Sequence, residues 1–176
     1  MADLDQGSPP FLPGIPSDPR LLADAAATRT LGRQLARMLQ PACRPGRAPL
    51  LLLLGDLGAG KTSLVQGLAE ELGINEAITS PTFALAHHYA GLDGAGSATA
   101  LVHLDLYRLE AGPAADELFA QEEEEALALG ALMAVEWPER LSALPPEAWE
   151  IQLGLACVGD PDAGRLARIT APASVA

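Results

Sequence analysis

The sequence has few cysteines and few basic residues, and each shortage argues against a class of protein. Its two cysteines, Cys43 and Cys157, lie far apart and outside any CxxC or Cys/His cluster, which argues against a zinc site or a disulfide framework. Lysine and arginine number 11 against 23 aspartates and glutamates, so the formal net charge is −12. A surface this acidic repels nucleic-acid phosphate unless its basic residues cluster. Because they are scattered here, we expect no tight direct binding to nucleic acid.

Long apolar runs are also missing. No stretch approaches the roughly 20 apolar residues that cross a bilayer, so we expect no membrane-spanning segment. The N-terminal segment has neither the basic leader nor the apolar core of a signal peptide, and we expect a cytoplasmic protein. At 176 residues, 49% of them hydrophobic, the chain can bury one sizeable core. We therefore expect a single domain over residues 21–172, after a flexible leader at 1–20 that holds five prolines.

The hydrophobic pattern switches between helical and strand periods along this domain. Apolar residues at helical spacing predict helices over 21–40, from Lys61 to Leu72, and over 115–130. The last helix contains four consecutive glutamates, Glu122–Glu125, which we interpret as a solvated face. Apolar runs and alternation predict strands at 50–54, 82–89, 101–107, 131–136, 149–158 and 165–170.

The segment GDLGAGKT, residues 55–62, matches the pattern G-x-x-x-x-G-K-[ST] and lies between a predicted strand and a predicted helix. Its glycines let backbone N–H groups turn toward phosphate oxygens, and the helix N-terminus adds partial positive charge. Lys61 is expected to reach the β- and γ-phosphates, and the Thr62 hydroxyl to ligate Mg²⁺. We call residues 55–62 the phosphate loop. The candidate nucleotide-binding residues here are Asp56, Leu57, Gly58, Ala59, Gly60, Lys61, Thr62 and Ser63.

With this loop, the predicted fold is an α/β, P-loop NTPase-like three-layer sandwich with a mixed parallel and antiparallel central sheet. Strands 50–54 and 131–136 are apolar enough to form a central parallel pair buried on both faces. Segments 82–89 and 101–107 are separated by turn residues and predict an antiparallel hairpin, as do 149–158 and 165–170.

The nucleotide is expected to be ATP with Mg²⁺. A guanine-specific GTPase normally carries an Asn-Lys-x-Asp element, and no such tetrapeptide is present. A small-molecule kinase usually holds its second substrate with arginines in a mobile lid. Residues 110–135, where a lid could lie, are acidic and contain no arginine or lysine. A kinase is therefore the weaker alternative.

Two acids compete for the role of magnesium ligand. Glu136 follows five apolar residues and so lies at the C-terminal end of a buried strand, where open α/β sheets bind ligands. In VHLDLY, Asp105 shares a polar strand face with His103 and Tyr107. We assign the metal to Thr62 and Glu136, and expect Asp105 to face the γ-phosphate, its attacking water or the metal's water shell. Lys61, Asp105 and Glu136 are the candidate catalytic residues.

A loop with two hydroxyls, Ser80 and Thr82 around Pro81, precedes the first hairpin. Such a loop could sense the γ-phosphate and position water, or it could be an ordinary turn entering a strand. The pattern alone leaves both interpretations open, and it leaves the general base open as well.

Together the segments GDLGAGKTSL, SPTFAL, HLDLYRL and EWPERL, in this order and spacing, resemble the TsaE (YjeE) family. The resemblance covers roughly residues 22–170. It implies a small P-loop ATPase that works with the partners TsaB and TsaD in tRNA N6-threonylcarbamoyladenosine biosynthesis at position 37. It also implies that tRNA is met only through the complex, and that ATP hydrolysis serves turnover of the complex and is not the carbamoyl transfer itself.

The resemblance also assigns residues. It associates Thr62 and Glu136 with magnesium and places Asp105 at the nucleotide. It brings Trp137 near the nucleotide and makes Arg165 a nucleotide or phosphate contact. The N-terminus of the first helix matches the family poorly, so its contacts stay open.

Two functions of different classes remain for such a protein. The first is an ATPase that is slow alone, because it has few cations to stabilise the transferring phosphoryl group, and is stimulated by its partners. The second is a nucleotide-gated binding module, in which bound ATP orders the Ser80–Thr82 loop into a docking surface.

Overall fold

The computed structural model describes residues 19–81 and 84–172. The leader expected at 1–20 lies outside this part of the chain except for Pro19 and Arg20, and Thr82 also lies outside it. Among the described residues, no helix combines the length and apolar character needed to cross a membrane.

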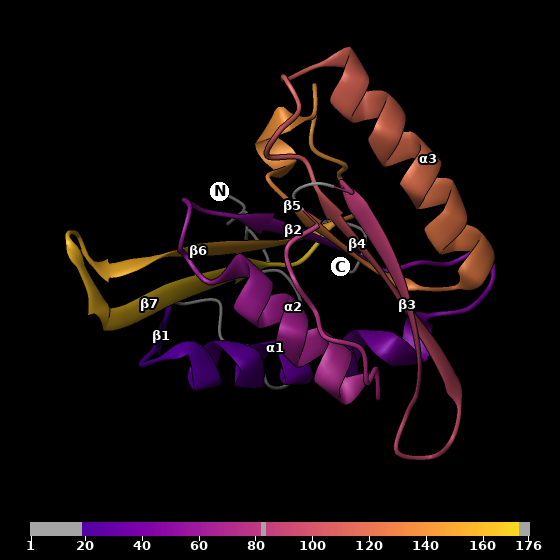
Figure 1. The fold of residues 1–176 in the computed structure, drawn as a ribbon, viewed down its shortest axis with the longest axis horizontal. Coiled ribbons are helices and arrows are strands. Elements are labelled where there is room, and N and C mark those ends of the chain that lie inside the picture. The colour runs from indigo at the N-terminus through magenta and orange to yellow at the C-terminus, as the bar shows by residue number, and fades with distance from the viewer. Residues whose placement is uncertain (1–18, 82–83, 173–176) are drawn as a thin grey trace, which may run out of the picture.

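One seven-stranded sheet forms the centre of the molecule, with the strand order β1-β7-β6-β2-β5-β4-β3 (Figure 1). The strands are β1 (Arg20–Leu22), β2 (Leu50–Leu54), β3 (Ala86–Leu92), β4 (Ala98–Asp105), β5 (Leu132–Glu136), β6 (Trp149–Cys157) and β7 (Asp160–Thr170). The α-helices are α1 (Ala25–Leu39), α2 (Lys61–Glu71) and α3 (Pro113–Leu129), and two short 3₁₀ helices are η1 (Gln40–Ala42) and η2 (Pro138–Arg140).

The sheet is mixed, as the sequence predicts. β2 and β5 form the expected central parallel pair, and β3–β4 and β6–β7 are the expected antiparallel hairpins. The parallel part is nevertheless wider than a pair, because β6 joins β2 and β4 joins β5 in parallel. Four strands therefore end at the same edge, and this edge carries the phosphate loop.

Helices cover both faces of the sheet and complete the three layers (Figure 1). One apolar core, which includes Leu51, Leu53 and Ala134, packs against α1 and α2. The other, which includes Leu52, Leu104 and Val135, packs under α3. Because side chains alternate along a strand, each central strand contributes to both cores. This alternation puts His103, Asp105 and Glu136 on the α2 side of the sheet.

The first helix begins later than predicted. Asp24 caps α1, because its Oδ1 accepts a hydrogen bond of 2.7 Å from the N–H of Ala27. Leu21 and Leu22 were expected in the helix, but they belong to β1 and pair with β7. A strand of three residues is too short to show a period of its own, so helical spacing was wrongly extended over it.

The first hairpin is shifted relative to its predicted bounds. Leu85 has φ of 65°, and its N–H donates to the carbonyl of Pro81 at 2.6 Å, so the chain turns there before β3 begins. β3 then continues to Leu92, which pairs with Ala98. The predicted turn is thus confined to residues 93–97, where Asp93 N–H donates to the carbonyl of Ser97.

The glutamate run on α3 is only partly the solvated face that its charge suggests. Glu124 and Glu125 are exposed, whereas Glu122 is 6% exposed. Its Oε2 lies 2.5 Å from Nε2 of His88 on β3. The helix turns this one glutamate toward the sheet because β3 supplies a polar partner for it.

Candidate functional site

The phosphate loop connects the end of β2 to the start of α2. Gly60 immediately precedes the helix with φ of 100°, a left-handed conformation that L side chains rarely adopt. At Gly55, also at positive φ, an added Cβ would overlap the carbonyl oxygen of Leu153 on β6. The helix then begins at Lys61 as predicted, so its N-terminal N–H groups point at the loop, where an anion is stabilised.

Lys61 is 4% exposed and folds back over the loop. Its Nζ donates to the carbonyls of Gly55 at 2.5 Å and Asp56 at 3.0 Å. Burial lowers the pKa of Lys61, and the negative charge of nearby carboxylates, Glu136 first among them, opposes this shift. The ammonium group thus sits in a dry, acid-lined position from which a phosphate could attract it.

Trp137 closes this position from the end of β5. Lys61 Nζ lies 4.1 Å from the centroid of the Trp137 ring, within the range of a cation–π interaction. The ring also packs against Tyr107, with centroids 4.8 Å apart and planes at 42°. Trp137 has φ of 59°, a conformation that costs a bulky residue roughly 1–3 kcal/mol and often marks functional sites.

Glu136 contacts the phosphate loop directly. Its Oε1 accepts a hydrogen bond of 3.1 Å from the Thr62 hydroxyl and lies 2.9 Å from Nε2 of His103. Glu136 and His103 are 3% and 0% exposed. The carboxylate is therefore held between the first turn of α2 and β4. A hydroxyl and a carboxylate oxygen at contact distance are hard donors of the kind that Mg²⁺ prefers, so these two residues fit the ion.

Asp105 lies beside Glu136, since the two residues are directly paired in the register of β4 and β5. Its Oδ2 accepts a hydrogen bond of 2.6 Å from the Ser80 hydroxyl, and its Oδ1 accepts one of 2.9 Å from the N–H of Tyr107. Asp105 is 3% exposed. Asp105 thus links the loop before β3 to the end of β4 beside Glu136, and among the described residues no hydrogen bond joins it to Thr62.

A cavity of about 280 Å³ opens on the other side of the phosphate loop. Thr28 near the start of α1, Ser63 on α2 and Arg165 on β7 line it together with loop glycines. The Arg165 guanidinium donates to the carbonyl of Gly58 from Nε at 3.3 Å and from Nη2 at 3.1 Å. The N-terminus of α1, whose contacts the sequence leaves open, therefore borders the loop.

The predicted site residues separate into two groups around the loop. Lys61, Thr62, Asp105, Glu136 and Trp137 gather where the parallel strands end. Arg165 lies at the cavity, and Asp56, Leu57 and Gly58 are exposed, with Leu57 78% exposed.

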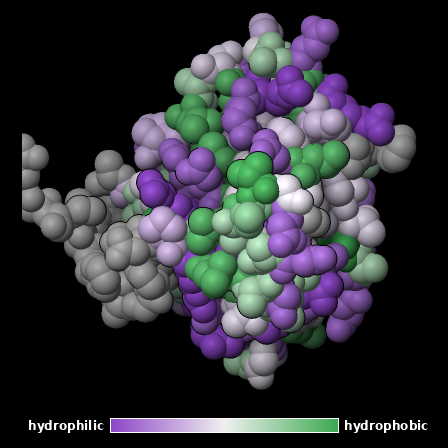
Figure 2. Space-filling model, turned by 90° about the vertical axis from the view of Figure 1, so that its left-hand side faces the viewer, coloured by the Kyte–Doolittle hydropathy of each residue, from purple (hydrophilic) through white to green (hydrophobic). Residues whose placement is uncertain are grey.

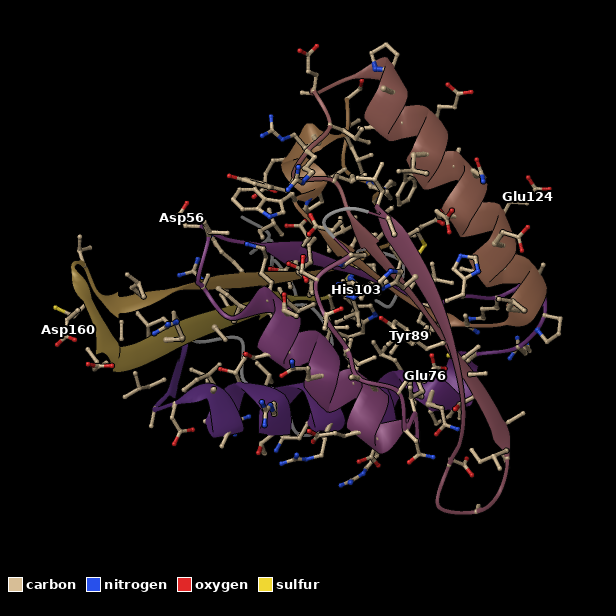
Figure 3. All side chains as sticks on the ribbon, viewed as in Figure 1. Asp56, Glu76, Tyr89, His103, Glu124 and Asp160 are labelled. Atoms are coloured by element: carbon tan, nitrogen blue, oxygen red, sulfur yellow. The ribbon has the colours of Figure 1, made fainter. Side chains whose placement is uncertain are left out.

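Sequence reasoning assigned no role to His103, which contacts Glu136 directly. The signal available was its place on the polar strand face, two residues before Asp105. Figure 3 shows His103 deep in the interior, between the sheet and α2.

Apolar side chains are exposed near this site, around the projecting β6–β7 hairpin. Val158 in its turn is 96% exposed, Leu155 and Leu166 are each 39% exposed, and Leu57 lies in the phosphate loop. Figure 2 faces this side of the molecule and shows hydrophobic residues gathered at its centre. Exposed apolar groups of this kind often mark a surface that meets another protein.

Comparisons with known proteins identify the family of this chain. A family model described as "Threonylcarbamoyl adenosine biosynthesis protein TsaE" matches residues 22–157. The chain is similar to tRNA threonylcarbamoyladenosine biosynthesis protein TsaE of Synechocystis sp., with 44% identity over 129 residues, 72% of this chain and 73% of that protein. It is 33% identical to the protein of the same name from Treponema pallidum over 136 residues, 77% of this chain and 89% of that protein.

A solved structure shows the same fold. The crystal structure of YdiB from Bacillus subtilis superimposes with a TM-score of 0.56 at 29% identity, covering 86% of this chain and 82% of that one. The family model's match at residues 22–157 spans the phosphate loop, Asp105 and Glu136. The chain therefore belongs to the TsaE family.

Proposed function

We propose that this protein is a Mg²⁺-dependent ATPase that supports N6-threonylcarbamoyladenosine formation at tRNA position 37 together with TsaB and TsaD partners. The observation that carries the ATPase is the contact of 3.1 Å between Thr62 and Glu136 at the mouth of a phosphate loop. The pathway rests on membership of the TsaE family, whose relatives are named for this biosynthesis. A location in the cytoplasm is part of the same proposal.

The two sides of the phosphate loop would divide the nucleotide between them. Its backbone N–H groups and the N-terminus of α2 would hold the β- and γ-phosphates. The cavity beside Gly58, lined by Thr28 and Arg165, would take part of the remaining nucleotide. Lys61 would exchange the carbonyls of Gly55 and Asp56 for phosphate oxygens. Its buried ammonium group would then pair with negatively charged oxygens in place of neutral ones.

The acids would then orient the reacting groups. Thr62 and Glu136 would hold Mg²⁺, which supplies positive charge to the phosphate oxygens. Asp105, held through both of its oxygens by Ser80 and the Tyr107 N–H, would position the attacking water. Phosphoryl transfer needs such positioning more than it needs a strong base.

Low activity of the isolated protein is part of this proposal. Lys61 is the cation that the loop itself contributes, and the carboxylates of Glu136, Glu139 and Asp105 surround it. Negative charge near the γ-phosphate opposes the charge that builds up there during transfer. A partner that supplies a cation or orders the site would therefore accelerate hydrolysis. The exposed apolar side chains around the β6–β7 hairpin offer a surface for such a partner.

The test is ATP hydrolysis by the purified protein with and without its cognate TsaB and TsaD, alongside modification of tRNA over many turnovers. We expect slow hydrolysis alone, stimulation by the partners, and loss of both with Lys61→Ala, which also abolishes ATP binding. Absence of stimulation would count against the partner assignment, and micromolar ATP affinity in Lys61→Ala would count against the phosphate loop.

A second function, a nucleotide-gated binding module, is favoured by the hydrogen bond between Ser80 and Asp105. Through this bond, a change at the γ-phosphate could reach the loop before β3 and create or remove a docking surface. The Glu136→Gln variant distinguishes the two functions. If this variant binds its partners with ATP but stops repeated tRNA modification, ATP hydrolysis is required for turnover. If modification continues, binding of ATP alone is enough.

A further inference from the structure

His103 is a fully buried imidazole that contacts the proposed metal acid. It lies on β4, is 0% exposed, and its Nε2 is 2.9 Å from Oε1 of Glu136. The Thr62 hydroxyl donates to the same oxygen. Oε1 is thus held by two donors, one from the helix that carries the phosphate loop and one from the sheet.

The two ring nitrogens of His103 differ in their partners, and this difference indicates why a histidine stands here. A carboxylate oxygen accepts hydrogen bonds, so Nε2 carries the hydrogen in this pair. Nδ1 is buried and has no hydrogen-bond partner among the described residues. A buried polar atom without a partner costs free energy, which an apolar side chain at this position would avoid. Simple packing therefore does not account for a histidine here, whereas a donor aimed at Glu136 does.

We propose that His103 is a positioning residue that orients the Glu136 carboxylate for magnesium. With Oε1 held by His103 and Thr62, Oε2 is left for the ion or its water, and no donor from the described part of the chain contacts Oε2. Outer groups of this kind set the orientation and affinity of a metal ligand, and removing one commonly costs 10- to 100-fold in metal affinity or activity. This inference rests on the proposed function, because it assumes that Glu136 serves the metal.

Two amide variants test the proposal with little change in polarity. His103→Gln can present an amide N–H near the position of Nε2, while His103→Asn is shorter and places its amide near Nδ1. The measurement is calorimetric binding of a non-hydrolysable ATP analogue over a series of Mg²⁺ concentrations and again in EDTA. We expect His103→Asn to raise the Mg²⁺ midpoint at least about tenfold. His103→Gln should stay near the wild-type midpoint, and metal-free affinity should stay within about twofold in both.

His87→Asn is the matched control. His87 lies on β3 directly opposite His103 in the register, but its Nδ1 contacts the Tyr89 hydroxyl at 2.9 Å. The change should leave the Mg²⁺ midpoint unaltered. Equal midpoints for His103→Gln and His103→Asn, or a parallel fall in metal-free binding, would overturn the positioning role. If His103→Asn does not fold, His103→Leu takes its place with the same expectation.

A readout without metal or nucleotide separates this inference from the proposed function. Nitrogen NMR of the imidazole rings in the wild-type protein should show His103 with its hydrogen on Nε2, in slow exchange with water. A hydrogen on Nδ1 alone would overturn the contact with Glu136. If this signal is present but the analogue binds without any dependence on Mg²⁺, the metal assignment fails and the orienting contact does not.

Discussion

The Thr62 hydroxyl lies 3.1 Å from Oε1 of Glu136, although 74 positions separate the two residues in the chain. The strand order brings them together, because β2 delivers the loop that starts α2 and its parallel neighbour β5 ends at Glu136. The two residues that we propose as metal ligands are thus brought together by adjacent strands of one sheet.

Removing either residue of this pair should slow metal-dependent hydrolysis while the phosphate loop still binds nucleotide. We expect Thr62→Val and Glu136→Gln each to lower Mg²⁺-dependent ATP hydrolysis at least about tenfold, with nucleotide binding in EDTA near normal. Thr62→Ser keeps the hydroxyl and serves as the control. Normal hydrolysis in Glu136→Gln would show that the metal is held elsewhere.

Asp105 should be needed for ATP hydrolysis but not for ATP binding. We expect Asp105→Ala to bind ATP almost normally and to lose hydrolysis, because we propose that its carboxylate positions the attacking water, and its hydrogen bonds go to Ser80 and Tyr107 and not to the phosphate loop. Ser80→Ala, which removes one of its two partners, should cause a smaller loss, and the double variant should match Asp105→Ala. If ATP binding collapses in Asp105→Ala while Glu136→Ala is benign, the two acids exchange roles.

Nucleotide binding should change the fluorescence of Trp137. Lys61 Nζ now lies 4.1 Å from the centre of its ring, and phosphate would draw the ammonium away. We expect the change in tryptophan emission on adding ATP to persist in Trp149→Phe, since Trp149 is 7% exposed on β6 in the core. The change should vanish in Trp137→Phe. A signal that depends on Trp149 would contradict the displacement of Lys61.

The close approach of α1 and α2 should make Gly32 irreplaceable. A Cβ at Gly32 would overlap the carbonyl oxygen of Leu64, part of the helix backbone, which cannot move aside. We expect Gly32→Ala to lower the free energy of unfolding by about 1–3 kcal/mol in urea titrations. Gly154→Ala on β6 meets open space and should change it by less than about 0.5 kcal/mol. Equal stability of the two variants would contradict this packing.

Cys43 should react slowly with thiol reagents at neutral pH. Burial raises the pKa of its thiol to about 11, so at pH 8 roughly one molecule in a thousand carries the reactive thiolate. In Cys157→Ala, alkylation of Cys43 by iodoacetamide should accelerate about tenfold per pH unit from 8 to 10, as the thiolate fraction rises below the pKa. In Cys43→Ala, the exposed Cys157 should be modified faster at pH 8. Mass spectrometry measures both rates.

Much of this architecture follows from local sequence. Five leucines after Pro49 predict a buried strand, and G-x-x-x-x-G-K-[ST] after it predicts a loop and helix that hold phosphate. Alternation at residues 101–107 predicts that His103 and Asp105 share a strand face. Glu136 is marked by the five apolar residues before it. These features depend on neighbours in the chain, so a linear pattern records them.

The remaining features are decided by contacts between distant segments. β1 forms because it pairs with β7. With only three residues, it is too short to show an alternating hydrophobic pattern in the sequence. β4 and β6 lie parallel to the central strands because of the strand order, which local spacing does not encode. The candidate site also depends on contacts between distant segments. The sequence shows that Thr62, His103 and Glu136 are present, but not that they meet. Only the packing of α2, β4 and β5 places a hydroxyl and an imidazole on one oxygen of Glu136.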